Sequence, residues 1–544
     1  MSITLYNRAL RITVAILGTG LTASALATAE SPRIGGNLIY LDQQAHTNLY
    51  PAIGGFYPNG GILNQITDKL TWQNPTTLKI EPWLAESWGV NNEKTEYTFK
   101  IRPNVTFSDG TPVDAYIVAK NFDYYGLGDK SHHYPASEVI NNYLKSEVID
   151  PLTVKFYFKK PSPGFLQGTS AIGSGIVSLS TLEHDFNQLG NGRNVVGSGP
   201  FIIQSDRPGH ETLLTARKDY NWAPASFKHQ GRPYLDSITV LVMPEDGVRI
   251  GALLAKQADF IRQVQAYDEK RVDKQGFLIY APPTRGVNNS ISFRPDNMLV
   301  ADIRVRKALL HATDTHDIVQ TLYSNHYPQA SSVLAKTAAG YVDLSSQLAF
   351  DPTTAQHLLD EAGWRLGPQG IRQKEGQALT LTTYESVPHP QNKEMLQRLA
   401  QQWARIGVQL HIKSGDAGSR TVDLLDPEKT AIYSTMVGRA DPDVLKSQYH
   451  PTLRNVLLQK GGLSTKVKQF EDTHLNTLLD AIASETNDQK RLALAGDVQR
   501  YLIQQAYVIP IFEEPQVYAG APTTHGITFE AVGRPSFYNT WLDK

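Results

Sequence analysis

The chain has 544 residues, of which 41% are hydrophobic and 19% are charged, and its formal net charge is −1. This composition is typical of a folded globular protein, and the length predicts two or three domains because single cores stop growing near about 250–300 residues. A charge near zero argues against nucleic acid as a partner, and the absence of cysteine excludes thiol catalysis, cysteine-ligated zinc and iron–sulfur clusters.

The N-terminal segment has the three parts of a secretory signal peptide. Arg8 and Arg11 form a basic start, residues 12–27 are an uncharged apolar run, and Ala27 and Ala29 are the small residues of a cleavage site. The run is shorter than the roughly 20 apolar residues of a membrane span. We therefore expect cleavage near Ala29 and a soluble, exported mature protein; the alternative is an uncleaved anchor.

Short strands mixed with single helices are predicted for the first third of the chain. Residues 36–42, 95–102 and 152–158 are strand candidates, the last two from their alternation of apolar and polar side chains. Asp109-Gly110 predicts a turn, and residues 114–122 predict a helix with one apolar face.

The middle of the chain has clearer helical signals. Asp302 can cap one helix, and Asp351, which is followed by proline, can cap a second that ends at Gly363. Residues 391–406 form an amphipathic helix, and a strand at 408–412 follows it directly. Alternation of strands and helices predicts an α/β layer, which binds ligands at the carboxyl ends of its strands.

No catalytic constellation is present in the sequence. There is no Gly-x-x-x-x-Gly-Lys phosphate loop, no Gly-x-Ser-x-Gly elbow and no His-Glu-x-x-His zinc helix. The acidic pair Glu513-Glu514 could serve a glycosidase, although such pairs are usually solvated. We therefore expect no catalytic residues, no cofactor and no bound metal, and an exported hydrolase is a remote alternative.

Seven segments resemble, in order, the signatures of one known family. They are Pro-Trp-Leu-Ala-Glu-Ser-Trp at 82–88, Tyr-Thr-Phe-Lys-Ile-Arg at 97–102, Phe-Ser-Asp-Gly-Thr-Pro-Val-Asp-Ala at 107–115, Gly-Ser-Gly-Pro-Phe at 197–201, Asp-Tyr-Asn-Trp at 219–222, and the helical segments 302–314 and 351–363. Together they resemble the family 5 extracytoplasmic solute-binding proteins, the peptide, nickel and opine-type metallophore receptors of ABC importers. One departure is that the glycine of the family's Gly-Glu-Ile-Asp turn is replaced near Lys256.

The resemblance implies an α/β, periplasmic-binding-protein-like clamp (type II, cluster C) with two lobes and an extra subdomain in lobe I. Hinge closure of two lobes around a ligand is the motion of periplasmic binding proteins. The expected parts are a signal peptide at 1–29, lobe I at 30–75, 195–285 and 510–544, its extra subdomain at 76–194, and lobe II at 286–509.

The resemblance also implies the function. We expect a monomeric periplasmic protein that captures a small zwitterionic solute, first of all a peptide, and delivers it to the permease and ATPase subunits of an ABC transporter. The alternative within the same fold is a receptor for nickel or an opine-type metal chelate.

The family's peptide receptors pair an aspartate of lobe II with the ligand's α-ammonium, in a segment that corresponds here to residues 437–443. The resemblance makes Asp441 the first candidate and Asp443 the second, unless both acids only shape an Asp-Pro turn. Arg439 presents a fork of donors that suits a ligand carboxylate, and its alternative is a salt bridge to one of the two aspartates.

Three further residues are candidate ligand contacts. Tyr384 and His389 follow a strand of the expected lobe II, where α/β sheets place ligands, although a solvated loop is the alternative. Arg285 lies at the expected hinge.

Overall fold

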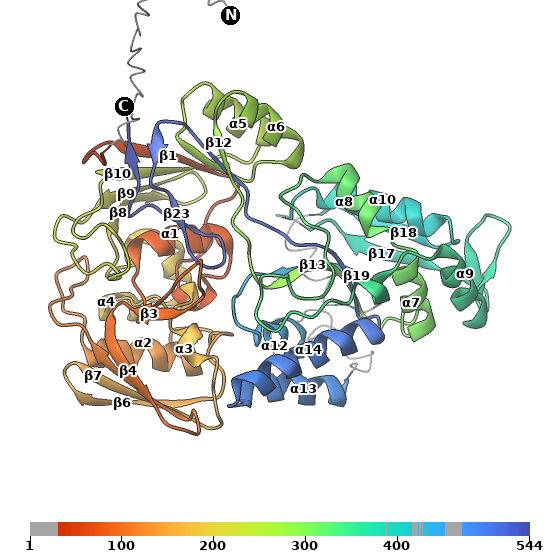
Figure 1. The fold of residues 1–544 in the computed structure, drawn as a ribbon, viewed down its shortest axis with the longest axis horizontal. Helices are drawn as coiled ribbons and strands as arrows, with labels where there is room; N and C mark the ends of the chain where they lie inside the picture. The colour runs from red at the N-terminus through yellow and green to blue at the C-terminus, as the bar shows by residue number, and fades with distance from the viewer. Residues whose placement is uncertain are drawn as a thin grey trace, which may run out of the picture. The chain divides into compact units, whose positions relative to one another are not determined.

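The computed structural model describes residues 31–386, 389–415, 423, 426, 428–451 and 471–543. The predicted signal peptide at 1–29 lies outside the described residues. Residues Arg33–Lys544 form one compact unit of mixed α/β structure (Figure 1). Within the described part of the chain, no helix has the length and apolar character needed to cross a membrane.

The largest sheet has seven strands. Their order is β12 (Leu278–Tyr280), β21 (Tyr518–Gly520), β11 (Phe260–Arg262), β1 (Asn37–Asp42), β10 (Ser237–Val242), β9 (Glu211–Ala216) and β8 (Phe201–Arg207). β1 is parallel to both of its neighbours, whereas the other pairs are antiparallel. Because β1 and β11 are parallel, their last residues, Asp42 and Arg262, reach the same edge of the sheet.

The two faces of this sheet belong to different hydrophobic cores. Leu38 and Tyr40 of β1 pack into the core that includes α1 (Tyr57–Ile66), whereas Leu41 packs into the core that includes α5 (Asp246–Leu254) and α6 (Ala266–Lys274). Successive side chains of a strand point to opposite faces, so one short strand joins both cores.

A second sheet has four strands, in the order β4 (Ala85–Val90), β5 (Glu96–Ile101), β7 (Thr153–Phe158) and β6 (Tyr143–Asp150). The alternation predicted for β5 is confirmed, since Tyr97, Phe99 and Ile101 are buried. Helix α2 (Ala115–Leu127) packs against this sheet, and the side chain of Asp114 caps it by accepting a hydrogen bond from the backbone of Ile117 at 2.9 Å. The helix is longer than predicted and ends at Gly128, whose φ is +70°.

A third sheet places β13 (Val287–Phe293) between β19 (Ile432–Val437) and β20 (Val508–Phe512). β20 runs through the boundary expected at 509/510 and stays paired with β13 up to Phe512. Shortly after β20, Pro515 forms an isolated β-bridge with Pro283, which precedes the boundary expected between residues 285 and 286.

The predicted strand–helix–strand unit is confirmed. β17 (Thr380–Tyr384) and β18 (Gln409–Lys413) are parallel, and α10 (Asn392–Ala404) connects them. Burial of Leu396, Leu399 and Trp403 on one face explains the amphipathic pattern of this helix.

The predicted caps are also confirmed. Asp302 caps α7 (Ile303–His311) and Asp351 caps α9 (Pro352–Glu361), each by accepting a backbone N–H. Gly363, with φ of +86°, ends the second helix in the left-handed conformation that glycine adopts without strain.

The remaining longer helices are α8 (Thr315–Leu322), α12 (Val444–Tyr449), α13 (Thr473–Ser484) and α14 (Asp488–Gln504). The short elements are η1 (Pro51–Ile53), β2 (Thr71–Gln73), β3 (Ile80–Pro82), α3 (Phe165–Gly168), η2 (Ile172–Ser174), α4 (Leu179–Leu182), η3 (Phe186–Gly190), η4 (Gly192–Asn194), η5 (Ser345–Leu348), β14 (Arg365–Leu366), β15 (Arg372–Lys374), β16 (Gln377–Ala378), β22 (Thr524–His525), β23 (Thr528–Phe529), β24 (Pro535–Ser536) and β25 (Trp541–Leu542). In Figure 1, α13 and α14 lie beside α3. Lys94, in the turn between β4 and β5, donates from its Nζ to Asp488 at the start of α14 at 2.8 Å.

Two predicted turns show how the backbone constrains the sequence. Gly110 has φ of +84°, and Thr111 donates its N–H to the side chain of Asp109 at 2.9 Å, as expected for the Asp-Gly turn. Lys256 has φ of +60°. The backbone therefore has a left-handed conformation, which favours glycine, in the stretch where the family's glycine is replaced.

Candidate ligand-binding cavity

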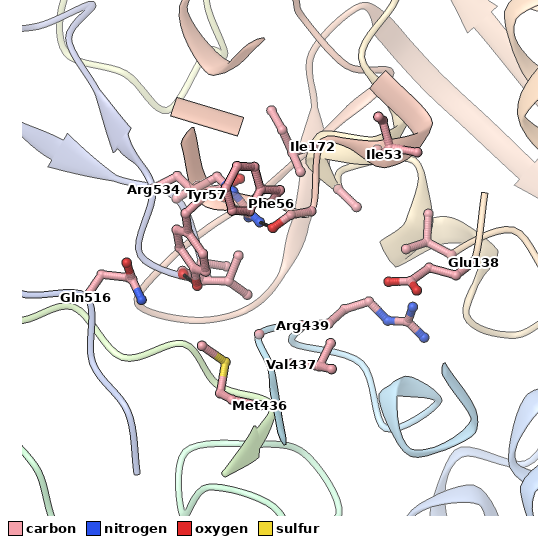
Figure 2. Close-up of a pocket in the computed structure, with 18 of the residues that line it drawn as sticks. Ile53, Phe56, Tyr57, Glu138, Ile172, Met436, Val437, Arg439, Gln516 and Arg534 are labelled. Carbon is pink, nitrogen blue, oxygen red and sulfur yellow. Dashed lines mark hydrogen bonds and ion pairs between the residues drawn. The ribbon is translucent and has the colours of Figure 1, made fainter. Parts of the chain in front are cut away.

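A cavity of about 620 Å³ lies between the N-terminal segments and the loops that follow β19 and β20 (Figure 2). Its walls come from many separate parts of the chain, namely the segment from Ala52 to Tyr57, β2, the loop 136–139, the segment 167–173, the end of β11, the residues Ser386 and His389, the end of β19, and the C-terminal segments 514–516 and 530–534. A cavity of this size is within the range of small-molecule sites.

Tyr57 at the start of α1 organises one side of the cavity. The guanidinium carbons of Arg534 and Arg262 lie 4.5 Å and 5.5 Å from the centre of its ring, and its hydroxyl donates to the carbonyl of Val532 at 2.7 Å. Such cation–π contacts fix the aromatic ring and both arginines together.

Both of these arginines are also held by acidic side chains. Arg534 Nη1 donates to Glu530 at 2.5 Å and Nη2 donates to the carbonyl of Gly55 at 2.7 Å. Arg262 Nη1 donates to Asp42 at 2.9 Å. Burial alone would lower the pKa of Arg262, but the charge of Asp42 outweighs it and raises that pKa above its ordinary value. Both guanidinium groups therefore stay charged while their charges are balanced.

Arg439, a candidate ligand contact, lies after β19 and lines the cavity. Its Nη1 donates to Ser447 at 2.8 Å and its Nη2 donates to Asp443, so the salt bridge that was its alternative is also present. Its Nε is buried and has no hydrogen-bond partner among the described residues. In Figure 2 the side chains of Arg439 and Glu138 lie at one end of the cavity, away from Gln516.

Asp441 and Asp443 lie outside the lining of the cavity, next to Arg439. Arg491 donates two N–H groups to Asp441, and the N–H of Asp443 donates to the side chain of Asp441 at 2.9 Å. This is the Asp-Pro turn that was the alternative for these acids. Asp441, for which the role of pairing with a ligand ammonium is predicted, therefore already has a cation partner within the protein.

The pKa values of the two aspartates are shifted in opposite directions. Burial would raise the pKa of Asp441, but Arg491 outweighs it and holds that pKa below its ordinary value. Burial and the negative charge of Asp441 raise the pKa of Asp443 in spite of Arg439. Asp441 is therefore the carboxylate that keeps its charge.

The charged cluster of Arg439, Asp441, Asp443 and Arg491 also contacts the part of the chain around the four-stranded sheet. Asn141 Nδ2 donates to Asp443 at 3.0 Å. A Cβ atom at Gly164 would lie 2.8 Å from an oxygen of Asp443, so the absence of a side chain there lets the backbone approach the cluster.

The other predicted contacts divide into one that lines the cavity and two that do not. His389 lines it, and its Nδ1 lies 3.1 Å from Glu514 Oε2. Tyr384 is buried on β17 and its hydroxyl donates to Asp423. Arg285, with φ of +53°, donates to the carbonyl of Pro75 at 2.8 Å. Neither of the last two is part of the lining.

Sequence reasoning missed five prominent side chains of the site, which are Tyr57, Arg262, Gln516, Glu530 and Arg534. None of them belongs to a local motif, because chain topology brings them together over more than 470 residues. The sequence suggests only a catalytic role for the acidic pair at 513–514, although Glu514 lines the cavity.

A mixed α/β fold with a cavity of this size and charged side chains in its lining suits a protein that binds a small solute. The sequence model of "Bacterial extracellular solute-binding proteins, family 5 Middle" matches residues 79–454, and the chain belongs to this family. The predicted family and fold class are thereby confirmed.

Known relatives agree with this assignment. The chain is 26% identical over 467 residues to the glutathione-binding protein GsiB of Shigella dysenteriae, covering 82% of this chain and 83% of that protein. It is similar in fold to the oligopeptide-binding protein AppA of Bacillus subtilis in complex with a nonapeptide, with a TM-score of 0.79, 19% identity and coverage of 94% and 100%. For NikA of Brucella suis in complex with Fe(III)-EDTA, the TM-score is 0.76, the identity 22% and the coverage 93% and 100%.

Membership of this family indicates a general role in solute uptake. Family 5 proteins are periplasmic, bind small ligands and work with the permease and ATPase components of ABC transporters.

Proposed function

We propose that this chain is exported, loses its signal peptide near Ala29, and captures a small zwitterionic peptide for an ABC importer. It works as a monomer and performs no chemistry on the ligand. The observation that carries this proposal is the cavity of about 620 Å³ in which Arg262, Arg439 and Arg534 are each held by an acidic side chain.

The balance of charges favours a ligand that carries both signs. Buried charges require partners, so the ammonium and the carboxylate of a ligand each need a group of opposite charge in the cavity. The cavity offers both signs, because arginines and glutamates line it. The relatives named for glutathione support a peptide, because glutathione is a tripeptide that carries both ammonium and carboxylate groups.

Arg439 is the proposed partner of the ligand carboxylate. Its Nε–H is buried without a hydrogen-bond acceptor among the described residues, and a carboxylate in the cavity can supply one. His389 is proposed as a second contact because its ring lines the same cavity.

Strand membership supports the proposed division into lobes. The seven-stranded sheet draws its strands from 30–75, 195–285 and 510–544, which supports lobe I, and the four-stranded sheet lies within 76–194, which supports the extra subdomain. Lobe II takes most of 286–509, and the length of β20 favours a return crossing near Pro515.

Mass spectrometry of whatever co-purifies with the mature protein tests the proposal. We expect native spectra to show a small added mass, and acid denaturation to release one or a few short peptides. Calorimetry with glutathione and synthetic di- and tripeptides then gives the length preference. Release of sugars or other solutes without amino groups would contradict the peptide proposal.

A metal chelate is a second candidate, favoured by the imidazole of His389 in the lining. In the described residues, no three His, Asp or Glu side chains converge as a metal site, so a metal would have to arrive with most of its ligands on a chelator. Elemental analysis of the purified protein before and after dialysis against EDTA tests this candidate. Stoichiometric nickel or iron would favour it over the peptide.

A further inference from the structure

Glu514 and Glu530 line the same cavity but differ in their partners. Glu530 is bound by Arg534, as described above. Glu514 has no arginine or lysine within salt-bridge distance among the described residues, and its only titratable partner there is His389. The side chain of Glu514 is 3% exposed, so water does not solvate its charge freely.

The hydrogen bonds of Glu514 leave one of its oxygens available. Oε2 accepts from Asn289 Nδ2 at 2.8 Å and lies 3.1 Å from His389 Nδ1. No described residue donates to Oε1. The neighbouring Asn289 Oδ1 is also buried without a donor among the described residues. Around Glu514 the described residues thus leave two oxygens, Glu514 Oε1 and Asn289 Oδ1, without a donor.

The other titratable side chains that feel the charge of Glu514 do not neutralise it. Tyr57, Tyr323 and Tyr327 are buried tyrosines whose pKa values are raised, first by burial and further by the negative charge of Glu514. Raised pKa values keep these phenols neutral at physiological pH. A carboxylate buried in such surroundings is costly unless a cation joins it.

We propose that Glu514 binds the ammonium group of the ligand, an inference that rests on the proposed function and deepens it. An ammonium group has a positive charge and three N–H donors, which matches a carboxylate that has no arginine or lysine partner and keeps one oxygen free. The Nε–H of Arg439 has no hydrogen-bond acceptor among the described residues, so Arg439 binds the ligand carboxylate. The ammonium site is therefore Glu514 and not Asp441, because Arg491 already neutralises Asp441.

The position of Glu514 gives this contact a second consequence. Its carbonyl accepts a hydrogen bond from Thr284 Oγ1 at 2.8 Å, next to the bridge between Pro283 and Pro515. A ligand ammonium on Glu514 would therefore act at the place where the two crossings between the proposed lobes meet.

Calorimetry with isosteric ligands tests the inference. The probes are trialanine and glutathione, each compared with an analogue in which a hydroxyl replaces the ammonium group. We expect the wild-type protein to bind the ammonium form at least tenfold more tightly. Glu514→Gln should abolish this preference, whereas the matched control Glu513→Gln should retain it, because Glu513 does not line the cavity.

The possible failures are distinguishable. A wild-type protein that binds ammonium and hydroxyl forms equally overturns the assignment of Glu514 whatever the variants do. So does a folded Glu514→Gln variant that keeps the tenfold preference, while peptide capture itself stands. If the wild type binds neither trialanine nor glutathione nor any other short peptide, the proposed function fails and the assignment of Glu514 fails with it.

Discussion

Arg491 donates hydrogen bonds to both carboxylate oxygens of Asp441, which lies 50 residues earlier in the chain; its Nη1 donates to Oδ2 at 3.0 Å and its Nη2 donates to Oδ1. The aspartate that the family motif predicts for the ligand is thereby part of the protein's own packing. Arg491 belongs to α14 and Asp441 to the loop after β19, so the pair joins the end of a sheet to a helix. The carboxylate proposed for the ligand ammonium is instead that of Glu514, which follows β20.

Replacement of Arg491 by methionine is expected to destabilise the protein. The change keeps much of the side-chain length but leaves Asp441 buried without its cation, which typically costs about 3–5 kcal/mol of the free energy of unfolding. Urea denaturation followed by circular dichroism measures this loss.

A matched control lies on the same helix. Arg500 pairs with Asp497 on the surface at 2.8 Å, with 46% of its side chain exposed, so Arg500→Ala should change stability by less than about 0.5 kcal/mol. Equal effects of Arg491→Met and Arg500→Ala would show that the buried pair does not stabilise the fold as described.

Arg439→Ala is expected to weaken binding of a peptide carboxylate by at least tenfold, because a charge-assisted hydrogen bond contributes about 1.5–3 kcal/mol. The same change leaves Asp443 unpaired and should also lower stability. The double variant Arg439→Ala/Asp443→Asn removes that unpaired charge. We expect it to recover much of the stability but none of the affinity, as measured by thermal unfolding and calorimetry. Recovery of affinity in the double variant would exclude Arg439 as a ligand contact.

Two adjacent glycines of α1 should respond in opposite ways to alanine. A Cβ at Gly60 would lie 2.6 Å from Arg534 Cδ and 2.7 Å from the carbonyl oxygen of Gly54, so Gly60→Ala must displace the arginine that lines the cavity. We expect a loss of about 1–3 kcal/mol in stability and weaker ligand binding.

Gly61 is the control, because a Cβ there meets no atom within 4 Å. Gly61→Ala should stabilise the helix by about 0.5–1 kcal/mol and leave binding unchanged. Chemical denaturation measures the free energy of unfolding of both variants. A change of the same sign in both would contradict the opposite roles of Gly60 and Gly61.

Asp68 should give the protein a measurable pH dependence. Burial raises its pKa to about 7, in spite of hydrogen bonds from Trp222 at 2.7 Å and Tyr220 at 3.2 Å. The unfolded chain releases this proton near pH 4, about three pH units earlier than the native protein. Between about pH 4 and 7 the native state therefore binds more protons, and the contribution of Asp68 to the free energy of unfolding falls as the pH rises.

Asp68→Asn cannot titrate and removes this term. The stability of the variant relative to the wild type should rise between pH 4.5 and 8, by on the order of 2–4 kcal/mol. Urea denaturation of both proteins across this range measures the difference. A constant difference, or one that falls with pH, would contradict a raised pKa for Asp68.

Local signals in the sequence predicted much of the fold. The alternation at 95–102, the caps at Asp302 and Asp351 and the helix before Gly407 all act within about one turn or strand, so short stretches of sequence are enough to specify them. The predicted boundary at 509/510 falls inside β20, because the register of a strand with its partner is a long-range property that its own residues do not encode.

The site was predicted less completely, and the reason is again physical. The sequence by itself determined that this chain has an α/β solute-binding fold, and two of its candidate contacts, Arg439 and His389, line the cavity, because motifs and strand ends are local features. Only the tertiary structure decided which charges are free. Arg491 reaches Asp441 and Arg534 reaches Tyr57 through chain topology, and electrostatic compensation depends on distances in space that sequence spacing does not fix.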